Sequence, residues 1–92
     1  METKSPTSVE QHTFDWAAEM ALSSPADTIS TSTWYANNGL TIDSDTKTST
    51  TTLCVRSGGR AYTYATLRNH IVCASGREYD RTMIVEVKPI LI

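Results

Sequence analysis

The clearest pattern in this chain is an alternation of apolar and polar positions in its second half. No Gly or Pro interrupts residues 60–74, where every second residue forms one compact, mostly apolar set: Ala61, Thr63, Ala65, Leu67, Asn69, Ile71 and Cys73. Because successive side chains of a strand point to opposite faces, we predict that this set points inward. A second alternating run, residues 82–87, places Met83, Val85 and Val87 inward. The Ser75-Gly76-Arg77 turn between the runs predicts a hairpin.

Shorter alternating runs precede this hairpin. Residues 28–35 and 40–42 flank Asn37-Asn38-Gly39, a sequence typical of a tight hairpin turn. In residues 47–56 we expect Thr51, Leu53 and Val55 to point inward and Cys54 and Arg56 outward. We interpret residues 43–45 (Asp-Ser-Asp) as a solvated turn rather than a calcium loop, because the other oxygen ligands of an EF-hand are missing. Residues 57–59 (Ser-Gly-Gly) form a further turn.

The two ends of the chain differ from this pattern. Residues 1–11 are mostly polar, which predicts a flexible N-terminal arm. Residues 14–22 favour a short strand that enters a helical turn, with Phe14 and Trp16 filling one end of the core. Residues 89–92 form an apolar C-terminal tip. One folded domain, residues 12–88, lies between them.

Composition supports the same fold class. Thr and Ser together occupy 25 of the 92 positions, and Thr is favoured on half-exposed sheets and disfavoured in helices. Short strands with turns every 8–12 residues, and without helices between them, predict an all-β fold: an antiparallel β-sandwich of about six to seven strands.

Charge and cysteine content exclude several classes of protein. The net charge is -2, and the eight Lys and Arg residues are spread along the chain, which argues against nucleic-acid binding. No apolar run is long enough to cross a membrane, and no signal peptide is visible, so we expect assembly in a cytosol-like compartment. Cys54 and Cys73 are expected to be free thiols, on opposite faces of the fold. Their surroundings lack the ligand spacing of a zinc site, and we expect no cofactor.

Catalytic motifs are missing as well. The chain has no GxSxG, HExxH or phosphate-binding glycine loop, and His12 and His70 have no predicted partners for triad chemistry. Asn69, an amide among inward apolar residues, is expected to pair with backbone groups, with a ligand contact as the alternative. We therefore predict that the protein is not an enzyme.

The candidates for a partner interface lie on the outward face of residues 60–70. Tyr and Arg are enriched at protein interfaces, and here they share one face with a histidine: Arg60, Tyr62, Tyr64, Arg68 and His70. Ordinary cross-strand pairing on a wet face is the alternative explanation. The tip residues Ile90, Leu91 and Ile92 complete the set, because exposed aliphatics at a chain end need cover from this domain or a neighbour.

Several motifs resemble those of a family of small proteins encoded among the virion genes of tailed bacteriophages. They are Asp15-Trp16, the segment from Asp27-Thr-Ile to Trp34, Gly39-Leu-Thr, the segment from Ser57-Gly-Gly to Gly76-Arg77, and Asp80-Arg81. The similarity spans about residues 14–88. It departs from the family pattern at Arg68, His70 and Cys73, where Thr is expected. The resemblance implies an immunoglobulin-like fold and a structural place in the phage particle.

From this resemblance we expect a structural virion protein, assembled in the bacterial host cytoplasm, that decorates or cements the capsid. Its expected partners are the major capsid protein or other virion subunits, and it is expected to form a homo-oligomer within the particle. Two alternatives remain open: a head–tail connector (neck) or tail accessory subunit, and a carbohydrate-binding module for the host surface.

Overall fold

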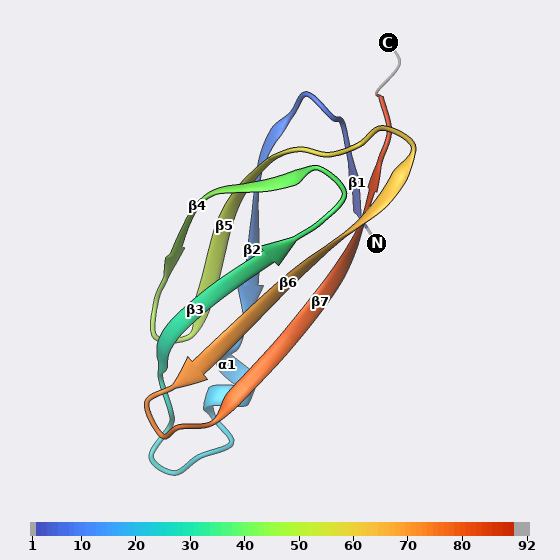
Figure 1. Ribbon diagram of the computed structural model, residues 1–92. Coiled ribbons are helices and arrows are strands. Elements are labelled where there is room, and N and C mark those ends of the chain that lie inside the picture. Colours follow the sequence, from blue (N-terminus) through green and yellow to red (C-terminus); the bar gives the residue numbers. More distant parts are fainter. Residues whose placement is uncertain (1, 90–92) are drawn as a thin grey trace.

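The protein is a two-layer β-sandwich, elongated to 50 × 21 × 20 Å, and the computed structural model describes residues 2–89 (Figure 1). Its elements, in chain order, are β1 (Glu2–Lys4), β2 (Val9–Asp15), α1 (Ala17–Met20), β3 (Ile29–Ala36), β4 (Leu40–Lys47), β5 (Thr51–Gly58), β6 (Thr63–Cys73) and β7 (Glu78–Val87). The predicted all-β sandwich, its number of strands and its helical turn near the N-terminus are confirmed.

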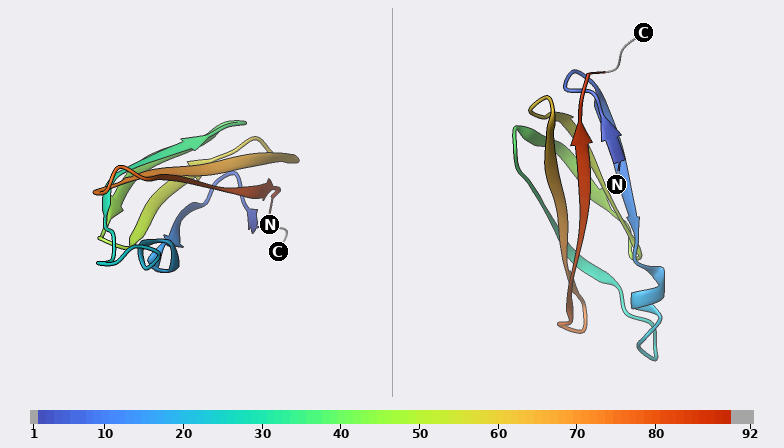
Figure 2. Two further views of the ribbon diagram at one scale, coloured as in Figure 1. Left: turned by 90° about the horizontal axis from the view of Figure 1, so that it is seen from below. Right: turned by 90° about the vertical axis from the view of Figure 1, so that its right-hand side faces the viewer.

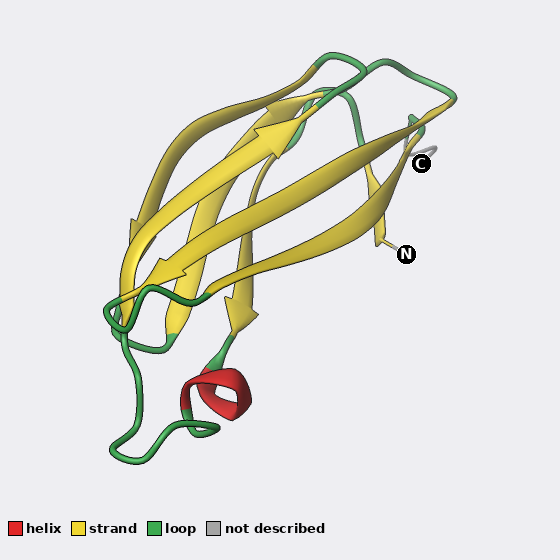
Figure 3. Ribbon diagram, turned by 60° about the horizontal axis from the view of Figure 1, so that its bottom comes forward, coloured by secondary structure: helices red, strands yellow, loops and turns green. Residues whose placement is uncertain are grey.

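Two sheets form the layers. The first has the strand order β1-β7-β6-β3 and the second the order β2-β5-β4. All pairings are antiparallel except that of β1 with β7, which is parallel. The consecutive strands β3 and β4 belong to different sheets, so the turn between them joins the layers at one edge. The helix α1 lies at one end of the sandwich (Figure 3).

The two glycine turns that the sequence indicated pack against each other. Asn38 and Gly39 have φ values of 51° and 80°, as the turn between β3 and β4 requires. The Gly59 N–H donates a hydrogen bond to the Gly39 carbonyl oxygen at 3.0 Å. A Cβ on Gly58 would lie 2.8 Å from the same oxygen, which is too close for any other residue. Glycine at position 58 therefore allows the β5–β6 connection to rest on the β3–β4 turn.

The inward face of the β6–β7 hairpin agrees with the alternation. Ala65, Leu67, Asn69, Ile71 and Cys73 are all buried, as are Val85 and Val87, while Met83 is half-buried against the core. The core continues through Phe14, Trp16, Met20, Ile29, Trp34 and Leu40. Phe14 and Trp34 stack with ring centroids 5.4 Å apart. The prediction that Phe14 and Trp16 fill the core is confirmed.

Asn69 is paired, but mostly with side chains, whereas backbone partners were predicted. Its Oδ1 accepts hydrogen bonds from Trp16 Nε1 at 3.1 Å and from Thr52 Oγ1 at 2.6 Å. Its Nδ2 donates to Ser32 Oγ at 2.9 Å and to the Thr33 carbonyl at 3.2 Å. These bonds connect β6 to β3, to β5 and to Trp16, which directly follows β2, so one amide joins the two sheets.

Strand β5 corrects the sequence prediction. Thr52, Cys54 and Arg56 are fully buried, whereas Leu53 and Val55 are half-buried on the other face. The apolar residues were expected inward because burying Thr and Arg is costly without partners. The partners come from distant segments: Asn69 accepts the Thr52 hydroxyl, and Arg56 forms ion pairs with Glu2 and Glu10.

The N-terminal segment also differs from the flexible arm predicted for residues 1–11. Its described part forms β1 and the beginning of β2. Lys4 is fully buried, and its Nζ donates hydrogen bonds to the carbonyls of Ser5, Ser8 and Gly58 at 2.7–2.8 Å. Desolvation lowers the pKa of this ammonium group. A polar composition therefore did not mean a loose segment, since polar contacts hold it.

Residues 43–45 and the placement of the two cysteines also differ from the predictions. Residues 43–45 lie within β4 rather than in a turn, with an irregularity in register between Ile42 and Ser44. Cys54 and Cys73 are free thiols, but Cys54 points inward, against the expected placement on opposite faces. Burial raises the pKa of the Cys54 thiol to about 11, so it stays protonated near neutral pH.

Candidate interaction surface

The outer face of the four-stranded sheet carries most of the exposed large side chains. We define the outer β6 face as the outward residues of β3, β6 and β7 together with the loop that leads into β6. Its large hydrophobic residues are Tyr62 (82% exposed), Tyr64 (60%), Ile84 (49%) and Tyr35 (47%). Val9 and Leu22, which are also exposed, lie outside this face. Large hydrophobic residues that do not belong to the core are thus concentrated on the outer side of the four-stranded sheet.

Tyr62 is presented by the backbone just before β6. Its φ is 62°, in the left-handed region that non-glycine residues rarely adopt. Its N–H donates to the Val87 carbonyl at 2.6 Å, which holds the turn against the end of β7. The most exposed tyrosine of the face is therefore attached to a fixed backbone.

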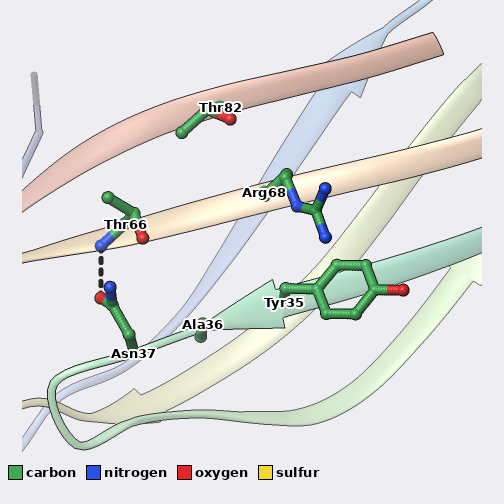
Figure 4. A pocket seen from close by; sticks show the side chains of 6 residues that line it. All are labelled: Tyr35, Ala36, Asn37, Thr66, Arg68 and Thr82. Atoms are coloured by element: carbon green, nitrogen blue, oxygen red, sulfur yellow. Dashed lines mark hydrogen bonds between the residues drawn. The ribbon is translucent and has the colours of Figure 1, made fainter.

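A shallow pocket of about 330 Å³ lies on this face (Figure 4). Its lining residues come from β3, β6, β7 and the β3–β4 turn: Tyr35, Ala36, Asn37, Thr66, Arg68 and Thr82. The Arg68 guanidinium lies 4.2 Å from the centre of the Tyr35 ring, a cation–π contact. The Thr66 N–H donates to Asn37 Oδ1 at 2.7 Å and fixes one wall of the pocket. An aromatic ring, a guanidinium and two hydroxyls thus surround a small hollow.

His70 lies farther along the same face, between two carboxylates. Its Nδ1 is 2.9 Å from Asp80 Oδ1, and its Nε2 is 2.8 Å from Glu78 Oε1. The hydrogen bonds to Asp80 and Glu78, in that order, raise the pKa of the imidazole. Both ring nitrogens face acceptors, which favours the imidazolium form. The group joins β6 to β7 on the outer side of the sheet.

The structure brings together the predicted interface residues that it describes. Tyr64, Arg68 and His70 lie on the outer face of β6, and Arg60 and Tyr62 lie in the loop that precedes it. Ile90, Leu91 and Ile92 fall outside the described residues. Tyr35 and Ile84 were not among the interface residues predicted from the sequence. Alternation could have found both, since Trp34 and Val85 beside them point inward.

The outer β6 face carries side chains suited to contacts with other proteins. Residues 2–89 contain no cluster of three or more side chains arranged to hold a metal ion. In the same range no helix has the length and apolar character needed to cross a bilayer. Exposed tyrosines beside an arginine are typical of protein-binding surfaces. Residues 2–89 therefore form a small β-sandwich whose outer β6 face carries the side-chain types that are enriched at protein interfaces.

The comparison with family models identifies the family of this chain. Residues 4–86 match the model of a family described as the podophage GP4 fiber-tail adaptor protein gp77, and the chain belongs to this family. It is a family of structural phage virion proteins rather than of enzymes. The match confirms the phage virion resemblance but not its immunoglobulin-like part. No curated protein and no solved structure gives a significant match.

Proposed function

We propose that this protein is an adaptor in a podophage tail that attaches a fibre component to a tail component through protein–protein contacts. Membership of the fiber-tail adaptor family over residues 4–86 is the observation that carries the proposal. The family is closer to the tail accessory alternative than to capsid decoration, which it does not support. The expected capsid-protein partner and the expected homo-oligomer stay predictions.

The fold suits a passive linking role. The sandwich is more than twice as long as it is wide, at 50 × 21 × 20 Å. The hydrogen bonds of Asn69 to Trp16 and Thr52 tie its two sheets together, and continuous strands such as β6 and β7 run along its length. Such a body holds two neighbouring proteins at a set distance and needs no chemical step to do so.

The outer β6 face is the proposed contact surface for one of these neighbours. Buried aromatic and arginine side chains dominate the energy of most protein interfaces. Tyr64 and Arg68 lie on the same face of β6, and the Arg68 guanidinium stacks on the ring of Tyr35, which belongs to β3. Arg68 and Tyr35 are thereby partly ordered before a partner binds, which lowers the entropy cost of binding.

The pocket offers little support for the carbohydrate-binding alternative. A sugar binds by stacking on an open aromatic ring, and the Arg68 guanidinium lies over the ring of Tyr35. The same arrangement is favourable for a protein partner, since an arginine on a tyrosine can still donate hydrogen bonds from its edge.

Localisation in purified particles tests the proposed function. Antibody labelling or an image reconstruction is expected to place the protein between tail and fibre. In a phage that lacks its own copy of the gene, the supplied double variant Tyr64→Ala/Arg68→Ala is expected to reach particles at least about tenfold less often than the unaltered protein. Val9→Ala, which changes an exposed residue of the other sheet, is the matched control and is expected to assemble normally.

Two results would contradict this proposal separately. Labelling on the head alone would exclude the adaptor role. Normal assembly of the Tyr64→Ala/Arg68→Ala variant, with the protein still in the tail, would exclude the outer β6 face as the contact while leaving the role intact.

A further inference from the structure

The strand edges of the two sheets are protected to different degrees. Unpaired edges invite further strands, and bulges or short length discourage them. The edge strand β4 has an irregular register at Ile42–Ser44, and the edge strand β3 has one at Ile29–Thr31. On the other side of the first sheet, β1 covers β7 over only three residues, Val85 to Val87. The rest of β7 pairs with β6 without any irregularity.

The backbone groups at this uncovered edge follow from the hydrogen bonds at the end of β7. The Val87 carbonyl accepts from Tyr62 on the β6 side, whereas the Lys88 N–H donates to the Lys4 carbonyl on the β1 side. Because successive residues of a strand direct their N–H and C=O groups to opposite sides, the groups of Thr82 and Asp80 point toward the open edge. Figure 2 (right) looks onto this edge, where β7 runs at the front and β1 lies beside its upper part.

We propose that the edge of β7 from Glu78 to Ile84 accepts an extended segment of a virion partner as an additional strand. The inference rests on the proposed adaptor function and adds a second contact, distinct from the outer β6 face. β1 already shows that the same edge takes a strand, since three of its residues pair there in parallel. Main-chain hydrogen bonds would supply the affinity, as in other cases of strand addition.

The side chains of β7 set the chemistry of that segment. Inward, Tyr79 and Met83 are half-buried at the rim of the core, and Arg81 between them is bonded to the Asp15 carbonyl and to Glu19. The partner therefore needs apolar residues beside Tyr79 and Met83. Outward, β7 carries Glu78, Asp80 and Glu86, with Thr82 and Ile84 between them. A complementary strand therefore has Lys, Arg or Thr at the positions between its apolar residues.

A second copy of this chain fits the edge less well. Two β7 strands paired antiparallel along the open edge, from Glu78 to Ile84, would place Arg81 directly opposite the Arg81 of the other copy. Like charges directly opposite one another destabilise a strand pair. The facing arginines thus favour a foreign strand over a second copy of this chain.

Hydrogen exchange tests the proposal on the unaltered protein. The Thr82 and Asp80 amides are expected to exchange rapidly in the isolated chain and at least about tenfold more slowly in purified particles, the effect of one backbone hydrogen bond. Equal exchange in both states, with the protein present in the tail, would overturn the strand addition without affecting the adaptor function. Absence of the protein from the tail would instead overturn the adaptor function on which the inference rests.

A pair of variants at one position separates backbone from side chain. Thr82→Pro removes the outward N–H and leaves the β6 ladder intact, because edge strands tolerate proline where the N–H faces solvent. Thr82→Val keeps that N–H and changes only the hydroxyl. Loss of particle incorporation for Thr82→Pro but not for Thr82→Val is expected. Equal incorporation of the two variants, or a concentration-dependent dimer of the isolated chain that Thr82→Pro abolishes, would overturn the proposal.

Discussion

Strands β5 and β6 are the central strands of their sheets, yet their inward rows differ in character. The buried row of β6 is apolar except for Asn69, whereas Thr52 and Arg56 leave Cys54 as the single apolar member of the buried β5 row. Burial of apolar area stabilises the first, and pairing of polar groups allows the second. One core thus contains two kinds of contact, and each should respond differently to substitution.

Asn69→Leu is expected to have the largest effect, because it breaks the connection between the two rows. The Thr52 hydroxyl, the Ser32 hydroxyl and the Thr33 carbonyl all lose a partner. Buried polar groups without partners cost about 1–3 kcal/mol each, and we expect a loss of about 4 kcal/mol in the free energy of unfolding. Urea unfolding measures this loss. Ser32→Ala, which removes one bond at a half-buried site, should cost about 1 kcal/mol; an equal cost for both variants would contradict the central role of Asn69.

Leu67→Ala tests the apolar row alone. Leu67 is fully buried, and truncation of a core leucine costs about 3 kcal/mol through lost burial and the cavity left behind. The loss should not change with salt concentration, since no charge is involved. The adjacent outward residue Thr66 provides the control: Thr66→Ala should change the free energy of unfolding by less than about 0.5 kcal/mol.

The contrast between these rows also explains what the sequence could predict. The faces of β6 and β7 were predictable because the apolar residues Leu67 and Ile71, and likewise Val85 and Val87, fall on one set of alternate positions. The faces of β5 were not, because Leu53 and Val55 have more apolar side chains than the buried Arg56. The residues that make Arg56 acceptable inside, Glu2 and Glu10, lie far away in the sequence. The alternation of polar and apolar residues describes one strand at a time and gives no information about partners from distant segments.

The same limit applies to the interaction surface. The outward residues of β6 were predictable by alternation, so Tyr64, Arg68 and His70 were identified. The role of Tyr35 depends on the pairing of β3 with β6, which sets Tyr35 opposite Arg68. That pairing joins residues more than 30 positions apart, and no local pattern encodes it.

Arg56→Met, in the buried row of β5, is expected to change the stability of the protein only slightly. The Nε and Nη1 atoms of Arg56 have no hydrogen-bond partner within the described residues, so its burial is incompletely compensated. Removal of one partner of an ion pair is costly when the other charge stays buried, but the side chains of Glu2 and Glu10 are 34% and 31% exposed and remain in contact with water. We expect a change within about 1 kcal/mol, together with a weaker dependence of stability on salt. A loss as large as that of Leu67→Ala would show that the charge itself stabilises the β5 row. Arg60→Met, at an exposed position, provides the control for loss of a positive charge.

The smallest expected effect concerns the outer side of β6, where His70 contacts Asp80 and Glu78 and where Arg68 lies 3.5 Å from Asp80. The carboxylates raise the pKa of His70 in the folded state above that of the unfolded chain. Its contribution to stability is therefore fully present below about pH 6.5 and is lost as the pH rises through the folded-state pKa. His12 has the opposite sign, because desolvation lowers its pKa and stability falls when the pH drops below its ordinary value.

Titration of the two histidines by NMR distinguishes these contributions. His70 should titrate above, and His12 below, the ordinary value near 6.5. His70→Gln should remove the part of the pH dependence that lies above about pH 6.5 and leave the part due to His12. If both histidines titrated at the ordinary value, the carboxylates of β7 would not hold His70 in its charged form. The outer face of β6 would then lack this electrostatic link to β7, and its pairing would rest on the backbone ladder alone.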